Sequence, residues 1–498
     1  MLKRRTLMGT AMAAAIPGAF LPLASAQTGK NMLTIGMPLE PPGLDPTTGA
    51  ASAIAEIAQY NIFETLTKVN ADGSVTPMLA ENWSSSPDMK TFVFRLRKGV
   101  RFENGQPFNA ATVKFSFDRA AAANSTNKDK RTFTNIATQV VDDYTVVLIT
   151  KEIEPDLLFL LGQASAILVE PKTVETNATK PVGTGPYRLE SWAKGSGIVL
   201  AKWDGWRHAE AVQIRKASFR FISEPAAQTT ALLSDDVDLF PHASVSRSLP
   251  QFQNDKRFQI VFNASRGKTI LAINNKRKPL DDVRVRRAIA AAIDRKAVIE
   301  ATVDGRGIPI GSHYVPGAPG YIDTTGINAY DVEKAKKLLA EAGVKTPLEL
   351  DFVLPPPPYA RQGGELIAAQ LAKVGIVAKI QNVEWAQWLS GTFGGAHDFD
   401  LTMVAHVEPF DLVNYTKPEY YWGYDSKSFR DLFAAIQNEE NKKRRADLLA
   451  EAQKQLATDA VNGFLFQAVF PTIARKEVKG LWASMPIVVN DLAAISWS

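Results

Sequence analysis

The residues best suited to chemistry gather in one stretch, which reads HVEPFDLVNYTKPEYYWGYD from His406 to Asp425. It combines carboxylates with a run of aromatic rings that follows neither helical nor strand periodicity. A ligand-binding cleft needs this mixture, since aromatic faces pack on apolar ligand parts and a few placed charges fix orientation. We therefore predict a binding loop here, with a buried core loop as the alternative. The residues expected to contact ligand are His406, Glu408, Asp411, Tyr415, Trp422 and Tyr424.

Two further candidates lie upstream of this loop. Arg361 follows the stiff polyproline segment 355–358, and its fork of donors suits a bidentate contact with a ligand carboxylate. A solvated arginine at the start of a helix explains Arg361 equally well. Trp385 follows a predicted strand over 376–383 and adds another aromatic face. Lys442-Lys443-Arg444-Arg445, in contrast, is interpreted as a solvated surface run on a long helix.

Other kinds of chemistry find little support. The five histidines show no HExxH spacing and no close pair on a helical face, so we expect no metal site. The absence of cysteine excludes a thiol nucleophile, and no GxSxG elbow is present. The glycine-rich segment 181–187, PVGTGPY, lacks the GK[ST] of a nucleotide loop and leads into a strand. We therefore expect neither a cofactor nor an enzymatic activity.

The amino-terminal segment is typical of an export signal. Basic residues at positions 3–5 precede a mild apolar run over 7–23, and Ala24-Ser25-Ala26 forms a small-residue cleavage site before Gln27. The pair Arg4-Arg5 resembles a twin-arginine signal, although a general secretory signal fits as well. A membrane anchor is the weaker alternative, because the apolar run is short and contains prolines.

The composition limits the partners and anchors that we expect for the mature protein. Lys plus Arg number 57 and Asp plus Glu 52, and three of the basic residues lie in the segment expected to be removed. The remaining charge is nearly balanced, so no nucleic-acid partner is implied. Without cysteine there is no attachment point for a lipid anchor. We expect a soluble periplasmic protein, and its 498 residues predict two or three lobes with a cleft between them.

Local patterns place several elements that must support the candidate site. Residues 91–97 alternate apolar and polar side chains as a half-buried strand does, and Asn104-Gly105 predicts a tight turn. Asn109 is positioned to cap a helix with an apolar stripe. Asp294 and Asp331 are expected to cap two further helices, and another helix is expected from Arg361. Strands and helices alternate here, which predicts an α/β second lobe.

Several short motifs occur along the chain. They are Pro77, Leu79-Ala80-Glu81, Trp83, Phe94, Leu96-Arg97, Gly99-Val100, Phe102, Val113-Lys114-Phe115-Ser116, the segment 181–187 and the segment 279–294. Together they resemble the motifs of the family 5 extracytoplasmic solute-binding proteins, the peptide/nickel-type components of ABC importers, and especially the periplasmic dipeptide- and oligopeptide-binding proteins. The resemblance extends over nearly the whole mature chain.

The resemblance implies a fold and a division of the chain. The fold is an α/β, two-lobed periplasmic binding protein of the type II kind, in which an extra subdomain is inserted in the first lobe and two crossovers join the lobes. The implied divisions are a signal peptide at 1–26, a first lobe at 27–267 with its insertion at about 68–180, a second lobe at 268–472, and a return to the first lobe at 473–498.

The resemblance also implies a function. The chain would capture a short peptide or a peptide-like amino-acid conjugate as a monomer and deliver it to an inner-membrane ABC permease. Opine- or sugar-like solutes, metal chelates, an exported hydrolase and a periplasmic chaperone are the alternatives. Peptide-binding relatives hold the ligand amine with an aspartate before a D/E-Pro pair; Glu408-Pro409 matches the pair, but Ala405 replaces the aspartate. Either Glu408 or Asp411 takes over, or the ligand lacks a free α-amine. Some relatives also place a carboxylate-binding arginine near Arg361.

The amino-terminal segment gives a direct test. Replacing both residues of the pair, Arg4→Lys with Arg5→Lys, should block export of the chain and leave uncleaved precursor in the cytoplasm, as fractionation and immunoblotting would show. Normal export of this variant would contradict the twin-arginine prediction and leave a general secretory signal.

Overall fold

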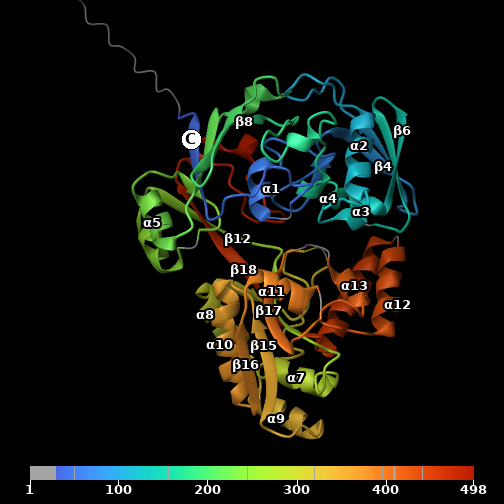
Figure 1. The fold of residues 1–498 in the computed structure, drawn as a ribbon, viewed down its shortest axis with the longest axis vertical. Coiled ribbons are helices and arrows are strands. Elements are labelled where there is room, and N and C mark those ends of the chain that lie inside the picture. Colours follow the sequence, from blue (N-terminus) through green and yellow to red (C-terminus); the bar gives the residue numbers. More distant parts are fainter. Residues whose placement is uncertain are drawn as a thin grey trace, which may run out of the picture.

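The computed structural model describes residues 30–498 apart from residues 50, 155, 244, 319, 395, 408–410 and 440. The predicted signal segment and Glu408 lie outside the described residues. The chain forms two lobes, each with its own helices, sheet region and apolar core (Figure 1). This confirms the predicted α/β, two-lobed class. Within the described part, no helix has both the length and the apolar character needed to cross a membrane.

The first lobe is built on a mixed sheet in the order β11-β1-β10-β9-β8. β1 runs parallel to β10 and β11, and its side chains Leu33, Ile35 and Met37 are buried in the core of this lobe. The strands are β1 (Met32–Met37), β8 (Tyr187–Ala193), β9 (Gly197–Lys202), β10 (Lys216–Phe221) and β11 (Leu239–Phe240). The helices are α1 (Ser52–Ala58), α5 (Pro225–Leu233), α6 (Leu249–Asn254) and the 3₁₀ turns η2 (Val174–Thr176), η3 (Ala209–Ala211) and η4 (Ser246–Ser248).

The inserted subdomain is a four-stranded antiparallel sheet, β4-β5-β7-β6, with helices packed on it (Figure 1). Phe92, Phe94 and Leu96 are buried while the residues between them are not, as the alternation predicts. Asn109 caps α2 in a reciprocal capping box with Thr112, which confirms the predicted cap. The elements are β2 (Thr67–Val69), β3 (Val75–Pro77), β4 (Ala80–Ser85), β5 (Thr91–Leu96), α2 (Ala110–Ala121), α3 (Lys130–Thr134), β6 (Ile136–Asp142), β7 (Thr145–Thr150), α4 (Leu157–Leu160) and η1 (Ala164–Ala166).

The second lobe has a sheet in the order β16-β15-β17-β13 with helices around it. Asp294 and Asp331 cap α8 and α9 through their carboxylates, as predicted. The elements are β13 (Lys268–Ile273), α7 (Val283–Ala291), α8 (Arg295–Val303), β14 (Gly307–Pro309), α9 (Val332–Glu341), β15 (Leu348–Leu354), α10 (Pro358–Ala372), β16 (Ile376–Asn382), α11 (Trp385–Gln387), the π-helix Trp388–Phe393, β17 (Leu401–His406), η6 (Leu412–Thr416), α12 (Lys427–Asn438) and α13 (Lys442–Thr458).

One helix boundary in this lobe differs from its prediction. α10 begins at Pro358, not at Arg361, so the last proline of the polyproline segment is already helical. Proline is tolerated in the first turn of a helix because its missing N–H has no partner there in any case. Arg361 therefore lies within the first turn of α10.

The lobes are joined by strands that share hydrogen bonds. β18 (Asn462–Arg475) pairs with β13 of the second lobe through residues 462–466, and with β12 (Phe258–Ala264) through residues 469–475. β18 also pairs with β11 of the first lobe. The first crossover is the short segment 265–267 between β12 and β13. β18 changes its pairing strand at residues 466–469. This point lies before position 473, where the sequence predicts that the chain returns to the first lobe.

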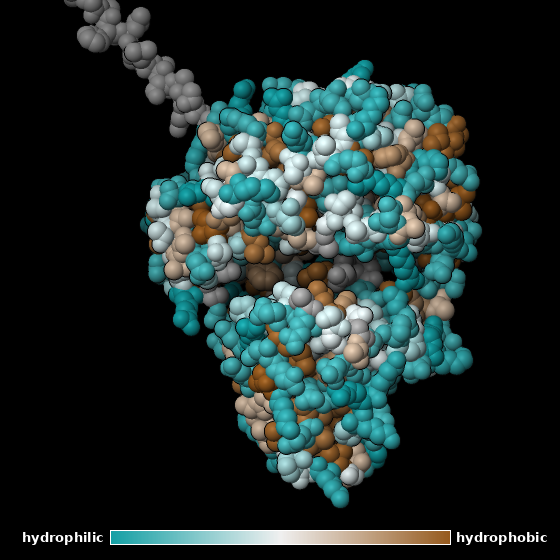
Figure 2. Space-filling view, in the orientation of Figure 1, coloured by the Kyte–Doolittle hydropathy of each residue, from teal (hydrophilic) through white to brown (hydrophobic). Residues whose placement is uncertain are grey.

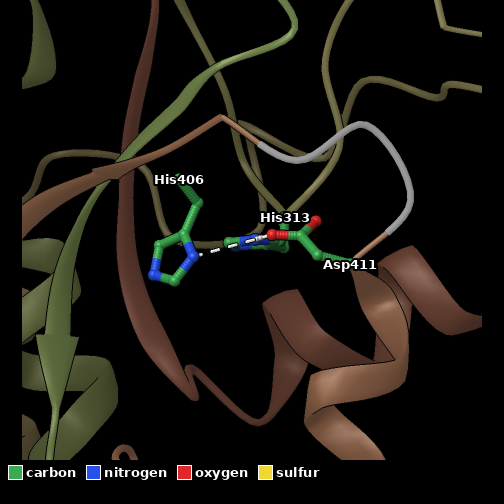
Figure 3. A group of neighbouring side chains, drawn as sticks. All are labelled: His313, His406 and Asp411. Carbon is green, nitrogen blue, oxygen red and sulfur yellow. Dashed lines mark hydrogen bonds and ion pairs between the residues drawn. The ribbon is translucent and has the colours of Figure 1, made fainter. Parts of the chain in front are cut away.

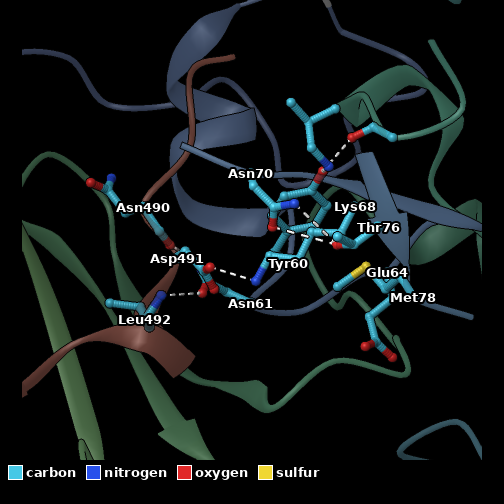
Figure 4. A network of polar contacts seen from close by, with 12 residues as sticks. Tyr60, Asn61, Glu64, Lys68, Asn70, Thr76, Met78, Asn490, Asp491 and Leu492 are labelled. Atoms are coloured by element: carbon cyan, nitrogen blue, oxygen red, sulfur yellow. Dashed lines mark hydrogen bonds and ion pairs between the residues drawn. The ribbon is translucent and has the colours of Figure 1, made fainter. Parts of the chain in front are cut away.

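The carboxyl-terminal segment is fixed to the first lobe by side-chain hydrogen bonds. Asn61 donates to the Asn490 carbonyl at 2.7 Å and accepts from the Leu492 N–H at 3.1 Å. Lys68 pairs with Asp491 at 2.5 Å (Figure 4). Two short elements complete this segment, the hairpin of β19 (Val478–Lys479) with β20 (Ser496–Trp497) and the 3₁₀ turn η7 (Leu492–Ala494). The segment after β18 thus belongs to the first lobe.

The glycine-rich segment 181–187 has a packing role. Its backbone lies directly against the chain at Asn61 and Ile62: Gly185 N–H donates to the Ile62 carbonyl at 2.9 Å and Tyr187 N–H to the Asn61 carbonyl at 2.8 Å. A Cβ at Gly183 would overlap the Ile62 carbonyl, so only glycine fits there.

This packing predicts the effect of one methyl group. Gly183→Ala should lower the free energy of unfolding by at least about 1–3 kcal/mol, because the backbone of Ile62 must move to admit the new Cβ. Urea unfolding followed by tryptophan fluorescence measures this. Gly326→Ala is the matched control, since nothing lies within 4 Å of a Cβ at that position. Equal stability of the two variants would contradict the close packing.

Candidate functional site

A cavity of about 920 Å³ lies between the inserted subdomain and the second lobe. The subdomain contributes the β4–β5 turn, α3 and the segment before α4, while the second lobe contributes η6, α12 and α13. Figure 2 shows the surface hollowed between the lobes. A volume of this size suits a small solute, since ligand pockets span about 300–1,000 Å³. We call this space the interlobe cavity.

A second group of candidates lies at the carboxyl ends of parallel strands. β16 and β17 both run parallel to β15, so these strands end at the same sheet edge. Arg361 follows β15, Trp385 follows β16, and His406 ends β17. The Arg361 guanidinium lies 3.5 Å from the Glu384 carboxylate, and Trp385 is 43% exposed. Because ligands of open α/β sheets bind beyond such an edge, both residues remain predicted ligand contacts.

Asp411 and Tyr415 of the predicted binding loop belong to a buried hydrogen-bond network, of which Figure 3 shows Asp411 with His313 and His406. Lys268 Nζ donates to Asp411 Oδ1 at 2.7 Å, and His313 Nε2 lies 2.7 Å from Asp411 Oδ2. Tyr415 Oη lies 2.9 Å from His313 Nδ1 and accepts from Asn462 Nδ2 at 2.9 Å. The network ties the loop to β13 and β18.

Charges within this network set the ionisation of its members. Burial alone would raise the pKa of Asp411, but His313 and Lys268 hold it well below its usual range, so the group is a carboxylate. Burial lowers the pKa of His406 to about 3, with a further contribution from His313, so His406 is neutral at physiological pH. Asp411 already has a cationic partner inside its own lobe. This pairing weakens the idea that Asp411 replaces the aspartate missing at Ala405.

His313, His406 and Asp411 also have the ligand types of a metal site. Their ligand atoms lie within 4.8 Å of one another. The Lys268 ammonium competes for the same carboxylate, and a cation next to an ammonium is unfavourable. His313 meets Asp411 through one ring nitrogen and Tyr415 through the other. The donor set therefore fits a hydrogen-bonded scaffold better than a metal centre.

The aromatic side chains of the loop belong to the core of the second lobe. Tyr415 and Trp422 are fully buried and stack with ring centroids 4.3 Å apart. Tyr424 is also buried, and its hydroxyl donates to the Asp459 carboxylate. This burial favours the core-loop alternative for these three residues, and their contact with ligand stays a prediction.

The inserted subdomain forms one wall of the cavity, which was not predicted from the sequence. Arg445 of α13 is paired with Asp156 of the subdomain at 3.3 Å, and its side chain is only 20% exposed. The interpretation of the basic run as solvated is therefore wrong for Arg445, whereas Lys443 and Arg444 are exposed. The sequence carries no signal for this pair, because Asp156 and Arg445 are separated by 289 positions.

Comparison with known proteins now defines the class. The model of the bacterial extracellular solute-binding proteins, family 5, matches residues 74–428, so the chain belongs to this family. It is 28% identical over 488 residues to the dipeptide-binding protein of Escherichia coli (strain K12). The aligned region covers 88% of this chain and 90% of that protein.

Solved structures share the fold. The periplasmic binding protein AgaA from A. tumefaciens R10, in complex with agropinic acid, aligns with a TM-score of 0.80 at 24% identity and covers 94% of this chain and 99% of its own. The periplasmic binding protein DppA from Helicobacter pylori, in complex with the peptide STSA, aligns with a TM-score of 0.79 at 23% identity and covers 94% of this chain and 98% of its own. These two likenesses concern the fold.

The buried network predicts a large stability effect. Lys268→Met removes the ammonium that faces the buried Asp411 carboxylate and should cost about 3–5 kcal/mol of unfolding free energy. Lys427→Met removes a lysine that pairs with Asp431 on an exposed helix face and should change stability little. Urea unfolding of both variants provides the comparison. An unchanged midpoint for Lys268→Met would contradict the scaffold role of the network.

Proposed function

We propose that this protein is the exported substrate-binding component of an ABC importer, which captures a short peptide or a peptide-like amino-acid conjugate between its lobes. It delivers this solute to an inner-membrane permease and carries out no chemistry of its own. Family membership supports the solute-binding role. The similarity to a dipeptide-binding protein over most of both chains supports the ligand class.

One observation carries the proposal. The two walls of the interlobe cavity belong to different lobes, and the lobes are connected through the strands around β18. A small rotation about those strands changes the distance between the walls and leaves each apolar core intact. A solute that contacts both walls stabilises the closed arrangement. This is the physical requirement for a receptor that signals its loaded state to a permease.

A second ligand class follows from Ala405 and Asp411. Ala405 provides no carboxylate, and Asp411 is occupied by Lys268 and His313. A ligand whose α-amine is blocked or substituted, as in opine-like solutes, needs no carboxylate there. AgaA, which shares the fold, is in complex with agropinic acid in its solved structure.

The experiment begins with the protein as purified from its host. Mild denaturation followed by mass spectrometry of the released small molecules identifies the bound solute. Calorimetry with that solute and ligand-free protein should then give one site per chain and an unchanged solute after prolonged incubation. Hydrolysis of the solute, or of chromogenic ester and peptide substrates, would contradict the receptor role and favour an exported hydrolase. Binding of unfolded proteins in place of a small solute would favour a chaperone.

A further inference from the structure

Ten charged side chains among the described residues line the interlobe cavity, and most have partners inside the protein. Asp411 is held by Lys268, and the Glu439 carboxylate accepts the Asn441 N–H at the start of α13. Three ion pairs account for six more, namely Lys128 with Asp129, Arg131 with Glu152, and Arg445 with Asp156. Two side chains of opposite sign remain, Glu154 and Lys417.

Glu154 comes from the inserted subdomain, between β7 and α4. No cationic side chain of the described residues lies within ion-pair distance of its carboxylate. Burial and the neighbouring Asp156 raise the pKa of Glu154 to about 7, although Arg131 and Arg445 oppose this shift. A positive charge placed next to Glu154 would therefore stabilise its ionised form.

Lys417 comes from the opposite wall, directly after η6. Its ammonium donates to the Asn414 side chain at 2.9 Å, but within the described part of the chain it forms no ion pair with a carboxylate. Burial and repulsion by Arg131 lower the pKa of Lys417. Glu154, Lys417 and Arg131 all line this cavity, and the charge of Arg131 shifts the pKa of the other two.

We infer that Glu154 and Lys417 determine specificity for a zwitterionic ligand: the ligand's ammonium group binds Glu154, and its carboxylate binds Lys417. The inference rests on the proposed function and identifies the charges that its ligand must carry. Among the described residues neither group has an ion-pair partner, so each contact with a ligand group of opposite charge strengthens as closure removes water. Apolar side chains beside them, including Leu412, Phe433 and Leu449, offer surface to the uncharged parts of the ligand.

This assignment differs from the pair suggested by the sequence. Asp411 has its own cation, and Arg361 lies at the sheet edge with Glu384. Glu154 and Lys417 stand on opposite walls and belong to different lobes. A ligand held by both therefore connects the lobes directly, which a ligand held by Arg361 and Asp411 of the second lobe alone would not do.

The test uses a library of free dipeptides, with N-acetylated and carboxyl-amidated copies of the same library as probes. Ligand-free protein is incubated with each library, and retained peptides are quantified by mass spectrometry and then titrated singly. Glu154→Gln and Lys417→Met remove the two charges with little change of shape. Glu175→Gln, exposed on the turn η2, and Lys443→Met, on the exposed face of α13, are the matched controls, because neither residue lines the cavity.

We expect the parent protein to retain free dipeptides and to bind both blocked libraries at least about thirtyfold more weakly. Glu154→Gln should bind free dipeptides at least about thirtyfold more weakly and lose the preference for a free amine. Lys417→Met should lose the preference for a free carboxylate, and the controls should match the parent.

Retention of free dipeptides by all variants at the parent's affinity would overturn the inference and leave the receptor role intact. An equal loss of affinity for free and blocked peptides would also overturn the inference, because it would mean that Glu154 and Lys417 pair with each other on closure. Weakening by Arg361→Ala alone would assign the carboxylate to the sheet edge and also overturn it. If the parent retains no peptide from any library, the peptide part of the proposed function fails as well.

Discussion

The structure depends on the backbone hydrogen bonds of β18, because this strand belongs to the sheets of both lobes. Its first part pairs with β13 and its last part with β12 and β11. Sliding one lobe along the other would break the backbone hydrogen bonds between β18 and its partner strands. A buried backbone group that loses its hydrogen bond costs free energy. Twisting about the strands around the change of partner at 466–469 preserves these hydrogen bonds. We therefore expect the lobes to move relative to each other by rotation about the strand crossing, which would displace the cavity walls beyond it most.

Asp411 differs from Glu154 and Lys417 in whether a neighbouring side chain compensates its charge. In the cavity wall formed by the second lobe, Asp411 is buried with Lys268 and His313, so its charge is compensated and the start of η6 is tied to β13. Within the cavity, Glu154 and Lys417 form no ion pair among the described residues, and burial disfavours the charged form of each. The first arrangement makes a rigid wall. The second leaves electrostatic free energy that a ligand of matching charge can recover, and it explains how a family fold could retain specificity without a carboxylate at position 405.

Local features of this fold follow from the sequence, and features that depend on tertiary contacts do not. The caps at Asn109, Asp294 and Asp331 and the buried face of β5 involve residues within a few positions of one another, and these predictions are confirmed. The start of α10 at Pro358 was not predicted, because a run of prolines is compatible both with an extended segment and, at its end, with the first turn of a helix. The aromatic loop could be recognised, but its burial depends on β13, α12 and β18, which are distant in sequence. Glu154 is one of three acidic residues between positions 152 and 156, and only its place in the cavity, where the other two pair with Arg131 and Arg445, distinguishes it from them.

Closure of the lobes on a bound solute changes the distance between the two sides of the cavity, which can be measured directly. The chain contains no cysteine, so Val141→Cys on β6 and Lys443→Cys on α13 place two spin labels at exposed sites on opposite walls. Pulsed electron paramagnetic resonance then records the distance distribution with and without the solute identified by mass spectrometry. We predict a broad distribution without ligand and a narrower, shorter one at saturation. An unchanged distribution at saturating ligand would contradict closure and with it the receptor mechanism proposed for this chain.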